Sequence, residues 1–235
     1  AGGEGNVVVT GSGSRWNAAA VTVGNNGAGN LTIANGGGVN ASGMLTIASA
    51  AASVGKTLVN GTGSELNVTG AINVGGLGSG TLTVEAGAFV SATGALSLDD
   101  PAGAPVATLN FLGGTIISNG FTRGGSSVFN WTDGTLLVSG GAFNNGGANF
   151  TINGGDFDDL PALRLAAGAQ SLVASIPNLT IGSSRRGAAI VSGGSTFATT
   201  SAAIGSLDGG NGSLVVEGLN SSFSTSGDLG VGGTP

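Results

Sequence analysis

The 235-residue sequence contains no cysteine and no histidine. It therefore cannot form a disulfide bond, and it lacks the thiolate and imidazole groups that bind most transition metals. The usual Ser–His nucleophile of hydrolases is missing as well, and Lys56 is the sole lysine that could act as a base in its place. We therefore expect neither an enzyme activity nor a cofactor.

Charged residues are also scarce, at 8% of the chain, and 12 acidic residues outnumber 6 basic ones. Six basic residues cannot form the stripe that binds nucleic acid, so no nucleic-acid partner is expected. No apolar run approaches the roughly 18 residues of a membrane-spanning helix. The chain begins without methionine or a visible signal peptide, and we expect a processed product or a segment of a longer protein.

Glycine is abundant, with 49 residues, and it is placed in a repeated pattern. In residues 21–33 (VTVGNNGAGNLTI) two short strands, each alternating apolar residues with threonine, flank a corner of Gly, Asn and Ala. The alternation indicates one buried and one wet face, and the corner residues tolerate left-handed backbone or close chain approach. The pattern returns at 72–84, 179–191 and 203–216. Such a unit cannot bury its own apolar face, so its copies must stack on one another.

The repeats form blocks of about 50 residues, and each block splits into halves of about 25 residues. The halves begin near Val7, Leu31, Leu58, Leu82 and Leu109. This length, with three short strands and three corners, is typical of one coil of a parallel β-helix. A hairpin meander is less favoured, because the alternation restarts in the same phase in every copy and the corners are longer than two residues. We predict an all-β, parallel β-solenoid of about nine or ten coils.

The predicted solenoid occupies residues 1–235 as one domain with four sections. Regular coils are expected over 1–108, and narrower coils filled by aromatic rings over 109–149. The pattern is disturbed over 150–178, where we expect an irregular loop or a short helical excursion. Regular coils resume over 179–235.

Three stretches carry a family resemblance: GSGSRWN at 11–17, VGNNGAGNLTI at 23–33 and NGGGV at 35–39. In these stretches the sequence resembles the repeats of bacterial autotransporter passenger domains and related large secreted surface proteins. The resemblance implies a right-handed parallel β-helix, export to the extracellular space or the bacterial cell surface, and an adhesive or fibre-forming role. Such motifs describe architecture and say little about chemistry.

The two ends of the sequence fit one another. The chain stops within a corner at 233–235, and joining this tail to residues 1–9 produces a stretch that matches 204–216. No capping segment is visible at either end, and solitary solenoids need caps. We therefore expect a structural fibre module that stacks head to tail on itself by strand addition, through Val7 and Val9 at one end and Leu229 and Val231 at the other. The alternative is an adhesive or glycan-binding stalk segment of one very long surface protein.

Other polar residues were weighed as sites. The acidic group Asp156, Asp158 and Asp159, with Arg164 nearby, could bind calcium in a polysaccharide-degrading enzyme, but a solvated loop is the preferred interpretation. We expect a turn at 99–101. We also expect a weak surface ion pair between the corner Arg185-Arg186 and the acidic residues of stacked corners, Asp208 and Glu4. Three asparagines match the glycosylation sequon, but we interpret them as stacked asparagines with left-handed backbone: Asn30, Asn149 and Asn178. Two tryptophans could be platforms for sugar binding, but we interpret them as packing residues: Trp16 and Trp131.

Overall fold

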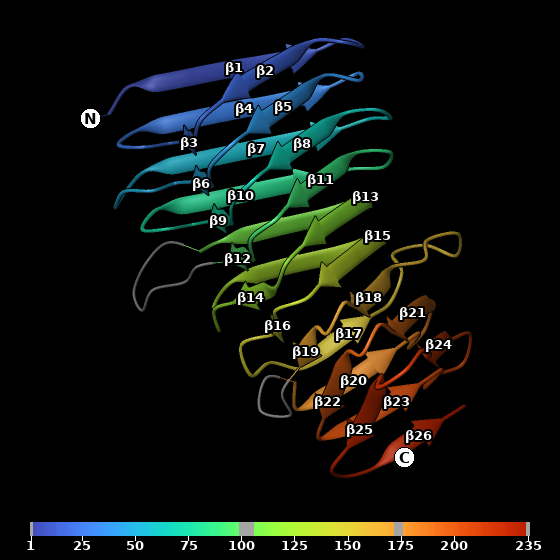
Figure 1. The fold of residues 1–235 in the computed structure, drawn as a ribbon. Helices are drawn as coiled ribbons and strands as arrows, with labels where there is room; N and C mark the ends of the chain where they lie inside the picture. The colour runs from blue at the N-terminus through green and yellow to red at the C-terminus, as the bar shows by residue number, and fades with distance from the viewer. Residues whose placement is uncertain (1, 99–105, 172–175, 234–235) are drawn as a thin grey trace. The chain divides into compact units, whose positions relative to one another are not determined.

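The computed structural model describes residues 2–98, 106–171 and 176–233, and in these residues the chain forms strands and corners without a helix (Figure 1). Successive strands pair in parallel with strands about one period further along the chain. The prediction of an all-β parallel solenoid is confirmed, with about nine coils. The turn predicted at 99–101 and the terminal residues 1, 234 and 235 lie outside the described residues.

The chain divides into two compact units, 1–118 with 126–130 and 119–125 with 131–235. In the first unit each coil contributes one strand to each of three parallel ladders. The first ladder is β1 (Glu4–Thr10), β4 (Ala28–Ala34), β7 (Val54–Asn60), β10 (Ser79–Val84) and the start of β13 (Thr108–Ser118). The second is β2 (Arg15–Ala18), β5 (Gly38–Ala41), β8 (Glu65–Val68), β11 (Phe89–Ala92) and the end of β13. The third is β3 (Val21–Val23), β6 (Leu45–Ile47), β9 (Ile72–Val74) and β12 (Leu96–Leu98).

The second unit also has three parallel ladders. The first is β15 (Val128–Ser139, of which 128–130 belong to the first unit), β18 (Ala162–Ala166), β21 (Arg186–Val191) and β24 (Asn211–Val216). The second is β14 (Phe121–Arg123), β16 (Ala142–Asn144), β19 (Gln170–Ser171), β22 (Thr196–Thr199) and β25 (Ser222–Thr225). The third is β17 (Phe150–Ile152), β20 (Asn178–Ile181), β23 (Ser201–Ile204) and β26 (Leu229–Val231).

The core of the first unit is aliphatic, and its side chains alternate inward and outward as a strand period of two requires. Leu31 and Ile33 on β4 are 2% and 0% exposed, and Thr32 between them faces outward. One sequence alignment was wrong, because the register places Thr57 rather than Leu58 beside Leu31. The corner before β7 is two residues longer than the corner before β4, so Leu58 moves to the outer face.

The core of the second unit is built around aromatic rings. Phe121, Phe143 and Phe197 are buried, and neighbouring rings lie 5.4 and 6.2 Å apart between centroids. Phe223 continues the series at 5.9 Å from Phe197, and we call these four residues the aromatic column. In the stretch predicted to be irregular, 153–161 forms a loop between β17 and β18, and the described residues contain no helix there.

Candidate self-association surfaces at the first and last coils

The first coil, β1 to β3, leaves part of its inward face uncovered. Among the described residues β1 pairs with β4 alone, with Val7 opposite Leu31 and Val9 opposite Ile33. Val7 is 41% exposed although it points to the same side as the buried Val9, which is 8% exposed. The outer edge of β1 is therefore an unpaired strand edge beside a partly exposed apolar side chain, which is the arrangement that accepts another strand.

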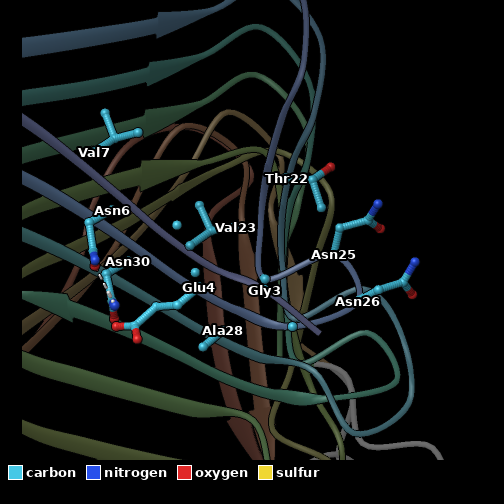
Figure 2. Close-up of a pocket in the computed structure, with 14 residues that line it drawn as sticks. Gly3, Glu4, Asn6, Val7, Thr22, Val23, Asn25, Asn26, Ala28 and Asn30 are labelled. Atoms are coloured by element: carbon cyan, nitrogen blue, oxygen red, sulfur yellow. Dashed lines mark hydrogen bonds between the residues drawn. The ribbon is translucent and has the colours of Figure 1, made fainter. Parts of the chain in front are cut away.

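A hollow of about 510 Å³ lies at the glycine corner of this coil (Figure 2). On one side Asn6 accepts a hydrogen bond of 2.7 Å from Asn30, with Glu4 beside them, and on the other side Asn25 and Asn26 point outward. A Cβ atom on Gly27 would overlap the backbone of residue 3, so the two chain segments are in direct backbone contact. The hollow is thus formed mainly by glycine-rich backbone, which suits close approach of another chain.

The last coil, β24 to β26, exposes more of its inward face than the first. Leu229 and Val231 are 49% and 74% exposed, although their register partners Ala202 and Ile204 are buried. Phe223, at the end of the aromatic column, is only half-buried. Among the described residues β24 pairs with β21 alone, so its other edge is unpaired too.

The two coils share the same corner conformation between their first and second strands. In the first coil Gly11 and Gly13 have φ of +93° and +83°, and the N–H of Ser14 donates to the Gly11 carbonyl at 3.0 Å. In the last coil Gly218 and Asn220 have φ of +83° and +63°, and the N–H of Ser221 donates to the Gly218 carbonyl at 3.4 Å. Because Asn tolerates left-handed backbone better than most residues, the two corners have nearly the same geometry despite different sequences.

Val7, Leu229 and Val231 are exposed on the first and last coils, and their role in self-association stays a prediction. Val9 differs from the other three, because its own coil and β4 already bury it. The matched corners were missed by sequence reasoning, although a signal was present. Gly-Ser-Gly-Ser at 11–14 and Gly-Leu-Asn-Ser at 218–221 share glycine, a residue able to adopt φ > 0, and serine at the same spacing.

The acidic candidates do not converge. Asp156 and Asp158 are exposed, and Asp159 turns back so that its Oδ2 accepts the N–H of Asp156 at 2.8 Å. Arg164 lies on β18 and forms no ion pair with them in the part of the chain that is described. Within that part, no three acidic side chains are grouped closely enough to hold a metal ion.

The corner Arg185-Arg186 makes a different contact from the one expected. The guanidinium of Arg185 stacks over the Phe157 ring at 4.4 Å, and Asn153 Oδ1 accepts the backbone N–H of Arg185 at 2.9 Å. No ion pair with Asp208 is present in the described residues. An Arg15–Glu65 pair of 3.7 Å occurs instead on the first unit, where the Arg15 side chain crosses Gly38.

The asparagine ladders are confirmed, but their backbone is not left-handed. Asn30 and Asn178 donate side-chain hydrogen bonds to Asn6 and Asn149 at 2.7 and 2.8 Å. Left-handed φ occurs at other asparagines, at the corners after β4 and β24: Asn35 and Asn220. Asn6 and Asn30 lie within β1 and β4, whereas Asn178 begins β20 and Asn149 directly precedes β17. Extended backbone at these positions brings equivalent side chains of successive coils together.

The remaining polar candidates are packing residues. Trp16 is half-buried, and Trp131 donates its indole N–H to the Asp133 carbonyl at 3.0 Å and packs against Phe150.

Partial burial lowers the pKa of the Arg123 guanidinium below its ordinary value through desolvation. None of the described residues belongs to a helix long and apolar enough to span a bilayer.

Comparison with known proteins adds no family to this description. No protein-family model matches the sequence, and no curated protein or solved structure shows significant similarity to it.

Proposed function

We propose that this chain is an extracellular structural module of a fibre, which grows by β-strand addition between end coils. The observation that carries the proposal is the pairing of features at the first and last coils. Each has an unpaired strand edge, partly exposed inward side chains at Val7 or Val231, and the same left-handed corner. Such edges are avoided or covered in isolated proteins, because they recruit other strands.

Strand addition would continue interactions that already hold the coils together. Fully burying a Val or Leu side chain contributes about 1.5–3 kcal/mol relative to full exposure, and Leu229 and Val231 are 49% and 74% exposed. The ladder adds backbone hydrogen bonds, each contributing about 0.5–1.5 kcal/mol net. The scarcity of charge, 8% of residues, allows coils to approach without strong repulsion.

The extracellular or cell-surface location rests on the resemblance of 11–17, 23–33 and 35–39 to secreted surface repeats. The absence of cysteine and the predominance of small polar residues on the outer faces fit that location.

A second candidate, a glycan-binding stalk segment, is favoured by a feature of the first unit. Asn17, Asn40 and Asn67 form a hydrogen-bonded ladder across β2, β5 and β8, with bonds of 2.8 and 3.2 Å. A hollow of about 460 Å³ runs beside it, lined also by Ser42 and Thr69. Amide and hydroxyl groups repeated along the axis could donate to and accept from sugar hydroxyls.

Sedimentation velocity and electron microscopy of the 235-residue chain test the fibre proposal. We expect concentration-dependent assemblies, and we expect a Leu229→Lys/Val231→Lys variant to remain monomeric. Leu77→Lys is the matched control, because Leu77 is 53% exposed but lies in a corner of the first unit. A wild-type chain that stays monomeric at every concentration would overturn the proposal, and specific binding to a glycan array would then favour the stalk.

A further inference from the structure

We infer that the association is polar, with the first coil of one copy covering the last coil of another in a single register. This rests on the self-association proposed above and specifies its partner surface. In that register Gly5 lies opposite Gly212, Trp16 opposite Phe223, and Val23 opposite Val231.

The first pair, β1 on β24, is aligned by glycine. Within the first unit Gly5, Gly29 and Gly55 are register partners, and within the second unit Gly187 pairs with Gly212. At all of these positions except Gly5 a Cβ would meet corner backbone, as at Gly212, where it would lie 2.7 Å from the Gly205 nitrogen. At Gly5 nothing lies within 4 Å of such a Cβ, so the alignment there rests on the shared register position of the glycines. Placing glycine on glycine sets Val7 opposite Leu214. A slip of one residue would instead place outward side chains over inward ones.

The second pair, β2 on β25, then follows without adjustment. Nine positions separate Val7 from Trp16, and nine separate Leu214 from Phe223. The corners between these strands have the same left-handed residues and the same closing hydrogen bond. Trp16 therefore reaches Phe223 and extends the aromatic column, in which Phe197 and Phe223 are already 5.9 Å apart. Stacked or edge-on rings contribute about 0.5–1.5 kcal/mol beyond their buried area.

The third pair, β3 on β26, is aligned by a repeated backbone hydrogen bond. The glycine that follows the third strand donates its N–H to the preceding coil, as Gly205 does to Ile181 and Gly232 to Ile204, both at 2.9 Å. Gly24 holds this position in the first coil, with φ of +75° against +72° at Gly232. In a stacked pair the Gly24 N–H therefore meets the Val231 carbonyl.

All three registers are parallel, and only a first coil on a last coil can satisfy them together. Two first coils facing each other would bring their strands together in antiparallel orientation and would lose the glycine and aromatic alignments. The contact is therefore heterologous, with different surfaces on the two copies. Repetition of such a contact gives an open filament unless the rotation closes a ring.

Cysteine cross-linking tests the register cleanly, because the natural chain has no cysteine. Val8 and Val215, both outward-facing and exposed, are opposite each other in the proposed register. Neighbouring strands are about 4.8 Å apart, within the Cα separation that a disulfide bridges. Under mild oxidation, mixed Val8→Cys and Val215→Cys chains should form a disulfide dimer that neither variant forms alone. Substituting Ser213→Cys for Val215→Cys shifts the thiol by two residues and should lower the yield.

Blocked ends test the polarity. Val7→Lys and Val231→Lys chains should each be monomeric alone, and a mixture should form dimers that do not grow further. Dimers of either variant by itself, or cross-linking of Val8→Cys alone, would overturn the polar register while leaving self-association intact. Failure of the wild-type chain to associate at all would instead overturn the proposed function, so the two failures are distinguishable.

Discussion

The two units fill the same kind of parallel ladder with different interiors. In the first unit the inward column on the second ladder is aliphatic, with Val39, Leu66 and Val90 all at 0% exposure. In the second unit the ladder of β14, β16, β19, β22 and β25 holds the aromatic column instead, including Phe143 and Phe197. A parallel ladder is thus defined by backbone pairing and by the period of two, and its inward face accepts either kind of side chain.

Their corners differ as well. Corners of the first unit combine glycine with positive φ, as at Gly36 and Gly61, with serine caps, since Ser53 Oγ accepts the Ala50 N–H at 3.3 Å. The second unit uses amide caps, since Asn153 Oδ1 accepts two backbone N–H groups at 2.9 and 3.1 Å, and Asn145 donates to the Ala148 carbonyl at 2.8 Å. Corners of uneven length leave backbone groups without ladder partners, so amide side chains satisfy them instead.

The largest expected change in the free energy of unfolding is for a substitution at the centre of the aromatic column. Phe143 is 1% exposed and has ring neighbours at 5.4, 5.2 and 6.2 Å. Phe143→Ala should lower the free energy of unfolding by about 3–5 kcal/mol, because it leaves a cavity and removes ring contacts. Leu66→Ala is the matched change in the first unit, with an expected loss of about 3 kcal/mol. Guanidinium denaturation measures both.

Each unit carries one of the two tryptophans, so the unfolding of each unit can be followed separately by fluorescence. Trp131 reports on the second unit and Trp16 on the first, so Trp→Phe backgrounds separate their fluorescence. We expect Phe143→Ala to shift the Trp131 transition more than the Trp16 transition. Equal shifts of both transitions would show that the two units unfold as one cooperative body. The difference in interior packing would then not make the stability of one unit independent of the other.

Most of the fold was predictable because every coil repeats the same constraints. Alternation identified the strands, and glycine corners with the 25-residue period identified the solenoid. The misplacement of Leu58 shows the limit. Alignment by residue type favoured leucine on leucine, whereas the two extra residues in the corner at 48–53 place Thr57 inside. Only the hydrogen-bonded register could decide between them.

The candidate site was predictable only in part. Joining tail to head selected Val7, Leu229 and Val231, and the structure exposes all three, while their role in self-association stays a prediction. The buried state of Val9 depends on packing within its own coil, and the Arg185–Phe157 contact joins residues 28 positions apart in irregular segments. Neither property has a period in the sequence, so pattern reasoning could not find them.

Replacing a buried threonine by valine should change the free energy of unfolding by an intermediate amount, with opposite sign in the two units. Thr57 in the first unit is 1% exposed, and its hydroxyl has no hydrogen-bond partner. Thr199 in the second unit is 0% exposed and donates to the Ile176 carbonyl at 2.8 Å. Thr57→Val should therefore stabilise the chain by about 1 kcal/mol, and Thr199→Val should destabilise it by about 1–2 kcal/mol. Thermal and guanidinium unfolding measure both, and destabilisation by Thr57→Val would contradict the assigned register.

The smallest expected effect concerns the outer face of the first unit. Asn40 donates to Asn17 at 2.8 Å and accepts from Asn67 at 3.2 Å, so Asn40→Ala breaks a ladder at its middle. Because these amides are partly solvated and can exchange their bonds for water, the loss should be only about 0.5–1 kcal/mol. Asn73→Ala is the control, since the Asn73 amide has no side-chain partner among the described residues and lies on the neighbouring ladder of the same unit. Chemical denaturation should rank Asn40→Ala below the control in stability. Equal stabilities would mean that the ladder adds nothing to coil stacking, and a role in ligand binding would then be the better explanation of the row.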